Sequence, residues 1–187
     1  EYIRNFIMST LETNLIQPST GTTLTVGASG DQITAATGVK TSFLYPAFEA
    51  YLSATQTITH DTTTKVAFNT EVYDTDSAFD TSAYKFTPQV AGKYFTYGNV
   101  TALAAIEELK RFSLYIYKNG STHKVSSFYF NNNEARYADI FIGTGIDMNG
   151  SSDYLEMYVK LEYASTGTLQ VNGTQGRSGF GAYRIGT

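Results

Sequence analysis

Acidic residues are concentrated in one short stretch of the chain, where Glu71, Asp74, Asp76 and Asp80 fall within ten positions. Carboxylate oxygens at close spacing are ligands that Ca²⁺ prefers, but the common calcium loop also has a central glycine and a final glutamate. This stretch lacks both at the required spacing, and aspartate is an ordinary turn residue. We therefore expect a solvated turn here, and a bound calcium ion is the alternative that the sequence leaves open.

Imidazole chemistry has two candidates, His60 and His123. Neither histidine has an acid and a nucleophile near it at the spacing of a hydrolase motif. The chain has no cysteine, which excludes disulfides and thiolate sites for metals or catalysis. On these grounds we expect no enzymatic activity, no metal site and no cofactor.

The remaining motifs point the same way. The glycine-rich runs at 27–30 and 143–150 lack the helix and lysine that follow a phosphate-binding loop. Other acids lie in predicted hairpin regions and not around the sugar cleft that a pair of glycosidase carboxylates needs; they are Glu107, Glu108, Glu134 and Asp139.

The composition is typical of strands and tight turns. Tyrosine (15) and phenylalanine (12) supply nearly all the large aromatic surface, tryptophan is absent, and proline is scarce. The net charge of −4 and the scattered basic residues give no surface for nucleic acid. No run of 18 apolar residues is present, so no membrane-spanning helix is expected.

The chain divides into an N-terminal arm, residues 1–42, and a head domain, residues 43–187. Residues 8–42 contain no aromatic side chain and are rich in Thr, Gly, Ser and Ala, so they cannot bury a core of their own. We expect an extended arm that adds short strands to a partner, with a flexible linker as the alternative. Its apolar side chains, the predicted anchoring residues, are Leu11, Leu15, Ile16, Leu24, Val26 and Ile33.

The start of the arm is ambiguous. Residues 1–7 precede Met8-Ser9-Thr10, which reads like a translation start, and they lack the basic and apolar regions of a signal peptide. They are either an extension or a genuine part of the arm.

The head domain shows period-two alternation of apolar and polar residues in many short segments. Phe48, Ala50 and Leu52 share one strand face, and Phe112, Leu114 and Ile116 share another. We expect about ten strands, near residues 47–52, 65–69, 84–87, 92–100, 112–117, 124–130, 138–146, 154–163, 168–171 and 178–185.

Two connections in the head domain can be predicted. Asn119-Gly120 is the preferred pair for a type I′ hairpin turn, in which both residues take positive φ. Residues 101–110 contain Ala, Leu, Glu and Lys, which favour helix, so one helical turn at most is expected there.

The order of landmarks in the head domain resembles the signature of C1q-like domains, the trimeric jelly rolls related to tumour necrosis factor. The landmarks are Phe68, Asp74, Phe79, Phe86, Gly92 and Tyr94, supported by Pro46-Ala47-Phe48 at the opening strand and Lys118-Asn119-Gly120 at the hairpin. The chain departs from the family pattern at Thr96, where a Phe is usual, and at the adjacent pair Tyr94-Phe95. The resemblance implies an all-β, ten-stranded C1q/TNF-like jelly-roll β-sandwich, preceded here by an extended arm.

The resemblance also implies a homotrimer. We expect its core and subunit seam to share the aromatic residues Tyr45, Phe48, Tyr51, Tyr158 and Phe180. The texture of residues 14–33 is similar to N-terminal segments of fibre-like and decoration-like virion proteins of marine tailed phages.

These two resemblances together predict a virion structural protein on the particle exterior. We expect a capsid decoration protein or short head fibre, anchored by the arm to other virion proteins. The alternative is a tail-fibre tip that recognises a host surface glycan or protein, with exposed tyrosines in 129–137 and 154–158 as the stacking surface.

Overall fold

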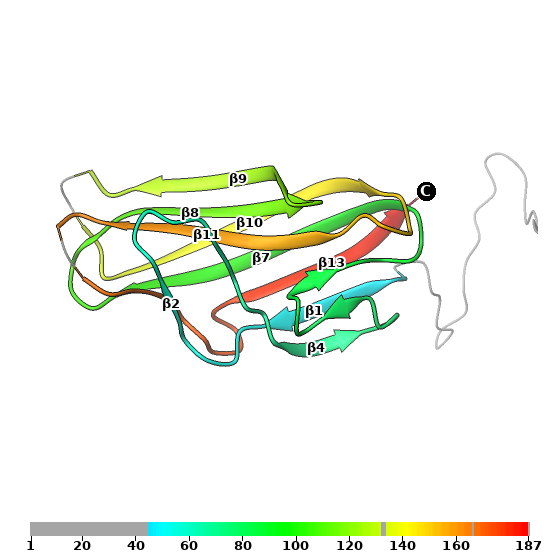
Figure 1. Cartoon of the computed structure of the whole chain (residues 1–187), viewed down its shortest axis with the longest axis horizontal. Helices are drawn as coiled ribbons and strands as arrows, with labels where there is room; N and C mark the ends of the chain where they lie inside the picture. The colour runs from blue at the N-terminus through cyan, green and yellow to red at the C-terminus, as the bar shows by residue number, and fades with distance from the viewer. Residues whose placement is uncertain (1–44, 132–133, 166, 187) are drawn as a thin grey trace, which may run out of the picture. The chain divides into compact units, whose positions relative to one another are not determined.

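The computed structural model describes residues 45–131, 134–165 and 167–186 of the 187-residue chain. This part is all-β and folds into two antiparallel sheets packed face to face (Figure 1). It contains no helix that is long and apolar enough to cross a membrane. The predicted arm and its six anchoring residues lie outside the described residues.

The described residues form thirteen strands. They are β1 (Ala47–Tyr51), β2 (Gln56–Ile58), β3 (Thr64–Lys65), β4 (Thr70–Asp74), β5 (Phe79–Asp80), β6 (Lys85–Phe86), β7 (Gly92–Ala104), β8 (Leu109–Lys118), β9 (Ser121–Tyr129), β10 (Tyr137–Met148), β11 (Leu155–Tyr163), β12 (Leu169–Val171) and β13 (Gly179–Gly186). The β-sandwich is as predicted, but the expected number of ten strands is too low. The three unpredicted strands are β2, β4 and β5; β4 has no buried position and hence no alternation to detect.

Sheet A is built around β7, the longest strand. β10 pairs with one edge of β7, while β13 and β12 pair with successive parts of its other edge. Beyond β13 the sheet continues through β1 to β4, and beyond β12 it continues to β2. Sheet B runs β5-β6-β11-β8-β9, with β3 also beside β11. Strands β9 and β10, each at an edge of its sheet, follow one another along the chain.

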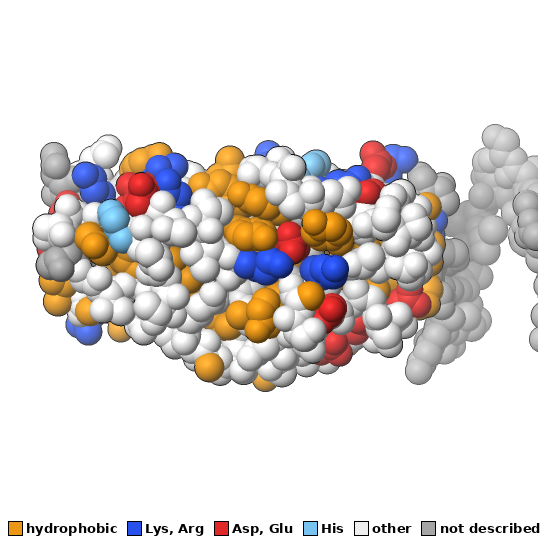
Figure 2. Space-filling view, viewed as in Figure 1, with side chains coloured by type: hydrophobic (Ala, Val, Ile, Leu, Met, Phe, Trp, Pro, Cys, Tyr) orange, Lys and Arg blue, Asp and Glu red, His pale blue; other side chains and the backbone are white. Residues whose placement is uncertain are grey.

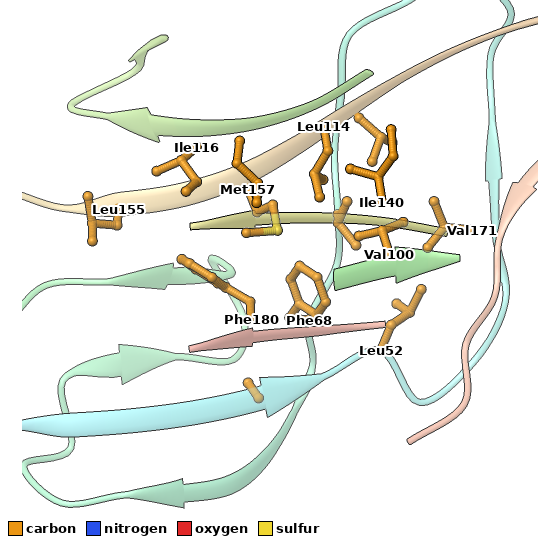
Figure 3. Close-up of a cluster of buried hydrophobic side chains, with 14 of the residues drawn as sticks. Leu52, Phe68, Val100, Leu114, Ile116, Ile140, Leu155, Met157, Val171 and Phe180 are labelled. Carbon is orange, nitrogen blue, oxygen red and sulfur yellow. The ribbon is translucent and has the colours of Figure 1, made fainter. Parts of the chain in front are cut away.

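The core lies between the inner faces of the two sheets (Figure 3). The predicted inward positions of β1 and β8 are buried, including Phe48 and Phe112 at 0% exposure. Phe48 stacks on Phe79 and Phe86 at centroid distances of 4.6 and 4.4 Å, and meets Phe180 edge-on at 5.0 Å. Aromatic pairs in these geometries stabilise a core beyond the area that they bury.

The hairpin between β8 and β9 has the predicted turn. Asn119 has φ 52° and Gly120 has φ 75°, as a type I′ turn requires. Asp153, in the connection between β10 and β11, lies against this turn. Its carboxylate accepts hydrogen bonds from Asn119 Nδ2 at 2.8 Å and from the Asn149 N–H at 2.9 Å, and it pairs with Lys118 Nζ at 2.8 Å.

The helical turn predicted within residues 101–110 is wrong. β7 continues to Ala104, a short bend follows, and β8 begins at Leu109. Ala102 and Ala104 are buried in the core, and Thr101 lies on the other face of β7. Pairing with β10 and β12 on both edges overrides the weak helical propensity of these residues.

The solvated turn expected over the acidic stretch is present only in part, because Glu71 and Asp74 belong to β4 and Asp80 to β5, with turns after each strand. Asp74 accepts the N–H groups of Asp76 and Phe79 at 3.1 and 2.8 Å, and Asp80 accepts those of Ser82 and Ala83 at 2.8 and 2.9 Å. Hydrogen bonds from the Ser82 side chain and from both backbone amides lower the pKa of Asp80. Among the described residues, no group of three or more His, Asp or Glu side chains is placed to hold a metal ion.

Candidate association surface

The outward face of sheet A carries a cluster of aromatic side chains from adjacent strands. Phe95 and Tyr97 of β7 have ring centroids 6.3 Å apart, and their planes differ by 23°. Tyr183 of β13 lies 5.8 Å from Phe95 and 6.5 Å from Tyr97. All three are half-buried, although they point away from the core. We call these three residues the sheet A cluster.

Glycines in the neighbouring strands give two of these rings their room. A Cβ at Gly181 of β13 would come within 2.5 Å of the Tyr97 ring, and one at Gly143 of β10 within 2.9 Å of the Phe95 ring. The rings therefore lie across the adjacent backbone instead of standing up from it. Aromatic side chains thus cover the strand glycines, and the resulting face is flat and apolar.

The Tyr97 hydroxyl makes polar contacts with neighbouring strands of sheet A. The Tyr97 hydroxyl donates a hydrogen bond to Glu49 Oε2 of β1 at 3.0 Å. Burial, together with hydrogen bonds involving Tyr73 and Glu49, raises the pKa of Tyr97 far above its ordinary value. The hydrogen bond to Glu49 fixes the orientation of the Tyr97 ring on the sheet.

A second group of apolar side chains lies along the neighbouring edge strands β9 and β10. Each of its members is more than half exposed: Phe128 at 55%, Tyr129 at 53%, Tyr137 at 61% and Phe141 at 64%. A pocket of about 200 Å³ lies at this edge, lined by Phe128, Phe130, Tyr137, Ala138, Asp139 and Ile140. We call the four exposed residues the β9–β10 edge. Exposed apolar side chains on unpaired strand edges are typical of a surface that another chain covers.

The outward face of sheet B has a different character, because its charges are paired. Lys65 pairs with Glu156, whose side chain is only 7% exposed, and Arg111 pairs with Glu162 at 2.8 Å. Tyr117 and Tyr158 stack on each other at 4.2 Å, so one face of each ring is already covered. Basic and hydrophobic side chains lie beside one another on the face seen in Figure 2. Val125 and Tyr129 of β9, 46% and 53% exposed, also lie on this face.

The five predicted core and seam residues are spread over the molecule. Phe48 and Phe180 have no exposed surface and pack together in the core. Tyr45, 38% exposed, precedes β1, and the half-buried Tyr51 ends that strand. Tyr158 lies on the outward face of sheet B, in the stack with Tyr117. The structure thus brings two of the five together, inside one subunit.

The six landmark residues serve the fold. Phe68, Phe79, Phe86 and Tyr94 are buried, and burial raises the pKa of Tyr94 to about 12. Asp74 caps its turn, as described above. Gly92 has φ 145°, and a Cβ there would lie 2.3 Å from the Gly186 carbonyl oxygen, so only glycine fits.

The histidines are placed apart from one another in the fold. The His60 ring stacks on Tyr163 at 3.9 Å, and its Nδ1 accepts the Tyr163 N–H at 3.2 Å. His123 is exposed on β9. These two contacts hold the loop that contains His60 against the end of β11.

The sequence reasoning missed the sheet A cluster and the β9–β10 edge. A usable signal was present at Tyr94-Phe95, because two adjacent aromatic residues in a strand must point to opposite faces. A strand that is apolar on both faces indicates that both faces are covered. Tyr94 is in the core, and Phe95 is in the cluster on the outside.

The fold is that of C1q and tumour necrosis factor domains. Similar solved structures include the globular domain of the zebrafish complement 1qA protein, at 16% identity and a TM-score of 0.54, covering 75% of this chain and 96% of that one. Murine APRIL is similar at 9% identity and a TM-score of 0.55, covering 74% and 98%. The Eiger TNF of S. frugiperda is similar at 13% identity and a TM-score of 0.51, covering 75% and 92%.

One curated protein similar in sequence is the phage-like element PBSX protein XkdV of Bacillus subtilis (strain 168). The two are 28% identical over 120 residues, which is 60% of this chain. The chain spans 17% of the length of that protein. No protein-family model matches the chain.

Proposed function

We propose that the chain is a structural protein of a phage particle, a homotrimer anchored by its N-terminal arm and displaying its jelly roll outward. The observation that carries this proposal is the 28% identity to a protein of a phage-like element, over 120 residues. Within the particle, a capsid decoration protein or short head fibre suits the chain, since it needs only an arm and a head. The role is non-catalytic.

The homotrimer is supported by aromatic side chains on more than one side of the subunit. The sheet A cluster, Tyr137 and Phe141 lie on the outward face of sheet A, whereas Tyr129 lies on the outward face of sheet B. When one surface of a subunit binds a different surface of the next, the contact is heterologous and a closed ring can form. Three copies then cover both surfaces on every subunit.

The arm supplies attachment in this proposal. It has six apolar anchoring residues and no aromatic residue between 8 and 42. Burial of apolar area contributes roughly 25 cal/mol per Å² to binding, so these few side chains bind each subunit only weakly. Three arms on one trimer make the attachment long-lived, because each rebinds while the others hold.

Localisation on intact particles tests the proposal. Antibody-labelled electron microscopy is expected to place the head domain on the capsid exterior, and light scattering is expected to give three times the 20.5 kDa subunit mass. A 20.5 kDa species at micromolar concentration would refute the trimer. Absence of the protein from particles would refute the structural role.

A second candidate function is recognition of a host surface glycan by a tail-fibre tip. The observation that favours it is the exposure of Tyr129 and Tyr137, because exposed tyrosine rings can stack on sugars. One face of each ring already carries a guanidinium group, that of Arg111 4.9 Å from the Tyr129 centroid and that of Arg136 5.8 Å from the Tyr137 centroid. A glycan array separates the two roles. Binding that Tyr137→Ala abolishes would support recognition, whereas an array without binding supports passive decoration.

A further inference from the structure

Four tyrosines lie together on the outward face of sheet B. Tyr115 of β8 is the cross-strand partner of Tyr158 of β11, and Tyr117 of β8 lies opposite Glu156. Tyr117 stacks on Tyr158 at 4.2 Å and meets Tyr115 at 6.1 Å, with their planes 86° apart. Tyr154, two positions before Glu156, points to the same side. All four rings are half-buried, so they form a low platform; we call these four residues the sheet B tyrosines.

The hydroxyl groups of three of these tyrosines have no partner inside the subunit. Tyr158 donates a hydrogen bond to Glu156 Oε2 at 3.4 Å, but Tyr115, Tyr117 and Tyr154 make no side-chain hydrogen bond with any described residue. Every buried side-chain nitrogen and oxygen in the described part of the chain has a partner. The three hydroxyls therefore lie at the surface, where each can donate one hydrogen bond and accept others.

The charges around the sheet B tyrosines balance one another. Lys65 of β3 pairs with Glu156. Lys85 Nζ of β6 lies 5.2 Å from the centroid of the Tyr154 ring, and the opposite charge of Asp80 lies beside it in the β5–β6 pair. Two further ion pairs lie on this face, Arg111–Glu162 and Lys160–Asp61. Because the face has no excess charge, it does not favour a polyanion, but it offers donors and acceptors side by side.

We infer that the sheet B tyrosines, together with Lys85, bind a neutral glycan. A sugar has apolar C–H groups, which pack against aromatic rings, and hydroxyl groups, which need both donors and acceptors. The platform supplies aromatic surface, three unpaired hydroxyls and one ammonium group on a single face. The stack of Tyr117 on Tyr158 orders both rings before binding, so less side-chain freedom is lost when a ligand binds.

This inference rests on the second candidate function, glycan recognition, and assigns it a site. The sheet B tyrosines and the sheet A cluster lie on opposite faces of the sandwich, so association through the sheet A cluster does not cover them. The site is also distinct from Tyr137, which lies on the outward face of sheet A.

Removal of the three unpaired hydroxyls tests the inference and leaves every ring in place. The triple variant combines Tyr115→Phe, Tyr117→Phe and Tyr154→Phe. The full chain is screened on an array of neutral hexose and N-acetylhexosamine oligosaccharides and of sulfated and uronic acid oligosaccharides. Calorimetry with the neutral oligosaccharide that binds best then compares the variants. We expect the triple variant to bind about tenfold more weakly or worse, with unchanged thermal unfolding, because these hydroxyls bond to nothing within the subunit.

Two single variants complete the test. Lys85→Gln is expected to weaken binding as well, because it removes the ammonium group beside Tyr154. Tyr137→Ala is the control, and it is expected to bind like the unsubstituted chain.

Equal binding by the triple variant and the unsubstituted chain would overturn the inference. Loss of binding in Tyr137→Ala alone would also overturn it and would assign recognition to the β9–β10 edge. Binding only to sulfated or uronic acid oligosaccharides would contradict the balanced charge of the site. If the unsubstituted chain binds no oligosaccharide on the array, glycan recognition itself fails, which is a distinguishable result.

Discussion

Asp153 connects two turns at one end of the sandwich, and its removal provides a direct test of how this end is stabilised. The carboxylate binds Asn119 Nδ2, the Asn149 N–H and Lys118 Nζ, all within 2.9 Å, and its side chain is 13% exposed. Hydrogen bonds to a charged group contribute about 1.5–3 kcal/mol each when poorly solvated. Because the turns can relax toward water, we expect Asp153→Ala to lower the free energy of unfolding by about 3 kcal/mol.

The pH dependence gives the same prediction a second readout. Hydrogen bonds from Lys118 and Asn119 lower the pKa of Asp153. A carboxyl group whose pKa is lower in the folded state stabilises the fold above its unfolded pKa, about 3.9, and loses that contribution as pH falls through the folded value. The difference between Asp153→Ala and the unsubstituted chain should therefore be full at pH 7 and shrink below about pH 4.

Urea unfolding followed by tyrosine fluorescence measures both effects. Asp147→Ala is the control, because Asp147 is an exposed aspartate on β10, and its loss should cost less than about 0.5 kcal/mol. Equal losses for Asp153→Ala and Asp147→Ala would refute the reasoning. So would a difference at pH 7 that persists unchanged at the lowest pH at which the domain stays folded.

Three further predictions address the hairpin, the core and the arm. Gly120→Val should lower the free energy of unfolding by roughly 1 kcal/mol or more, because φ is 75° at this position. Ser121→Val should change it little, and equal losses for the two variants in urea unfolding would contradict the prediction. Phe180→Ala should lower the free energy of unfolding by about 3–5 kcal/mol, because Phe180 is 0% exposed. Phe141→Ala should leave the free energy of unfolding unchanged, because Phe141 is 64% exposed, and should weaken only the association that sedimentation measures. Deleting residues 1–42 should leave a folded trimer that no longer binds particles; a truncated chain that still binds, or that fails to fold, contradicts the proposed roles of arm and head.

Period-two alternation predicted most of the sandwich, because a strand with one buried face has apolar residues at every second position. Phe112, Leu114 and Ile116 are an example, and all three are buried. β4 shows no such alternation, because its central residues are all exposed. It is a strand only because it pairs with β1. Residues 101–104 show the converse, since their local preference for helix yields to pairing with strands that are distant in the sequence.

The association surface could be predicted only in part, because its parts meet through strand register. Phe95 and Tyr97 share one face of β7, but Tyr183 is 88 positions from Phe95 and becomes their neighbour only when β13 pairs with β7. The role of Gly181 depends on the same register, since the Tyr97 ring lies over it. The sequence shows which residues are aromatic, but only the pairing register of the strands shows which of them share a face.

Alternate positions of β7 serve the core and the proposed association surface. Tyr94, with 0% exposure, and Val100 point into the core, whereas Phe95 and Tyr97 point outward into the sheet A cluster. Because successive side chains of a strand point to opposite faces, a change at one set leaves the packing of the other largely intact. Tyr94→Ala should thus unfold the subunit, and Phe95→Ala should leave it folded while weakening its association. The two properties can vary independently along one strand, which allows the outward face to change its partner without loss of the jelly roll.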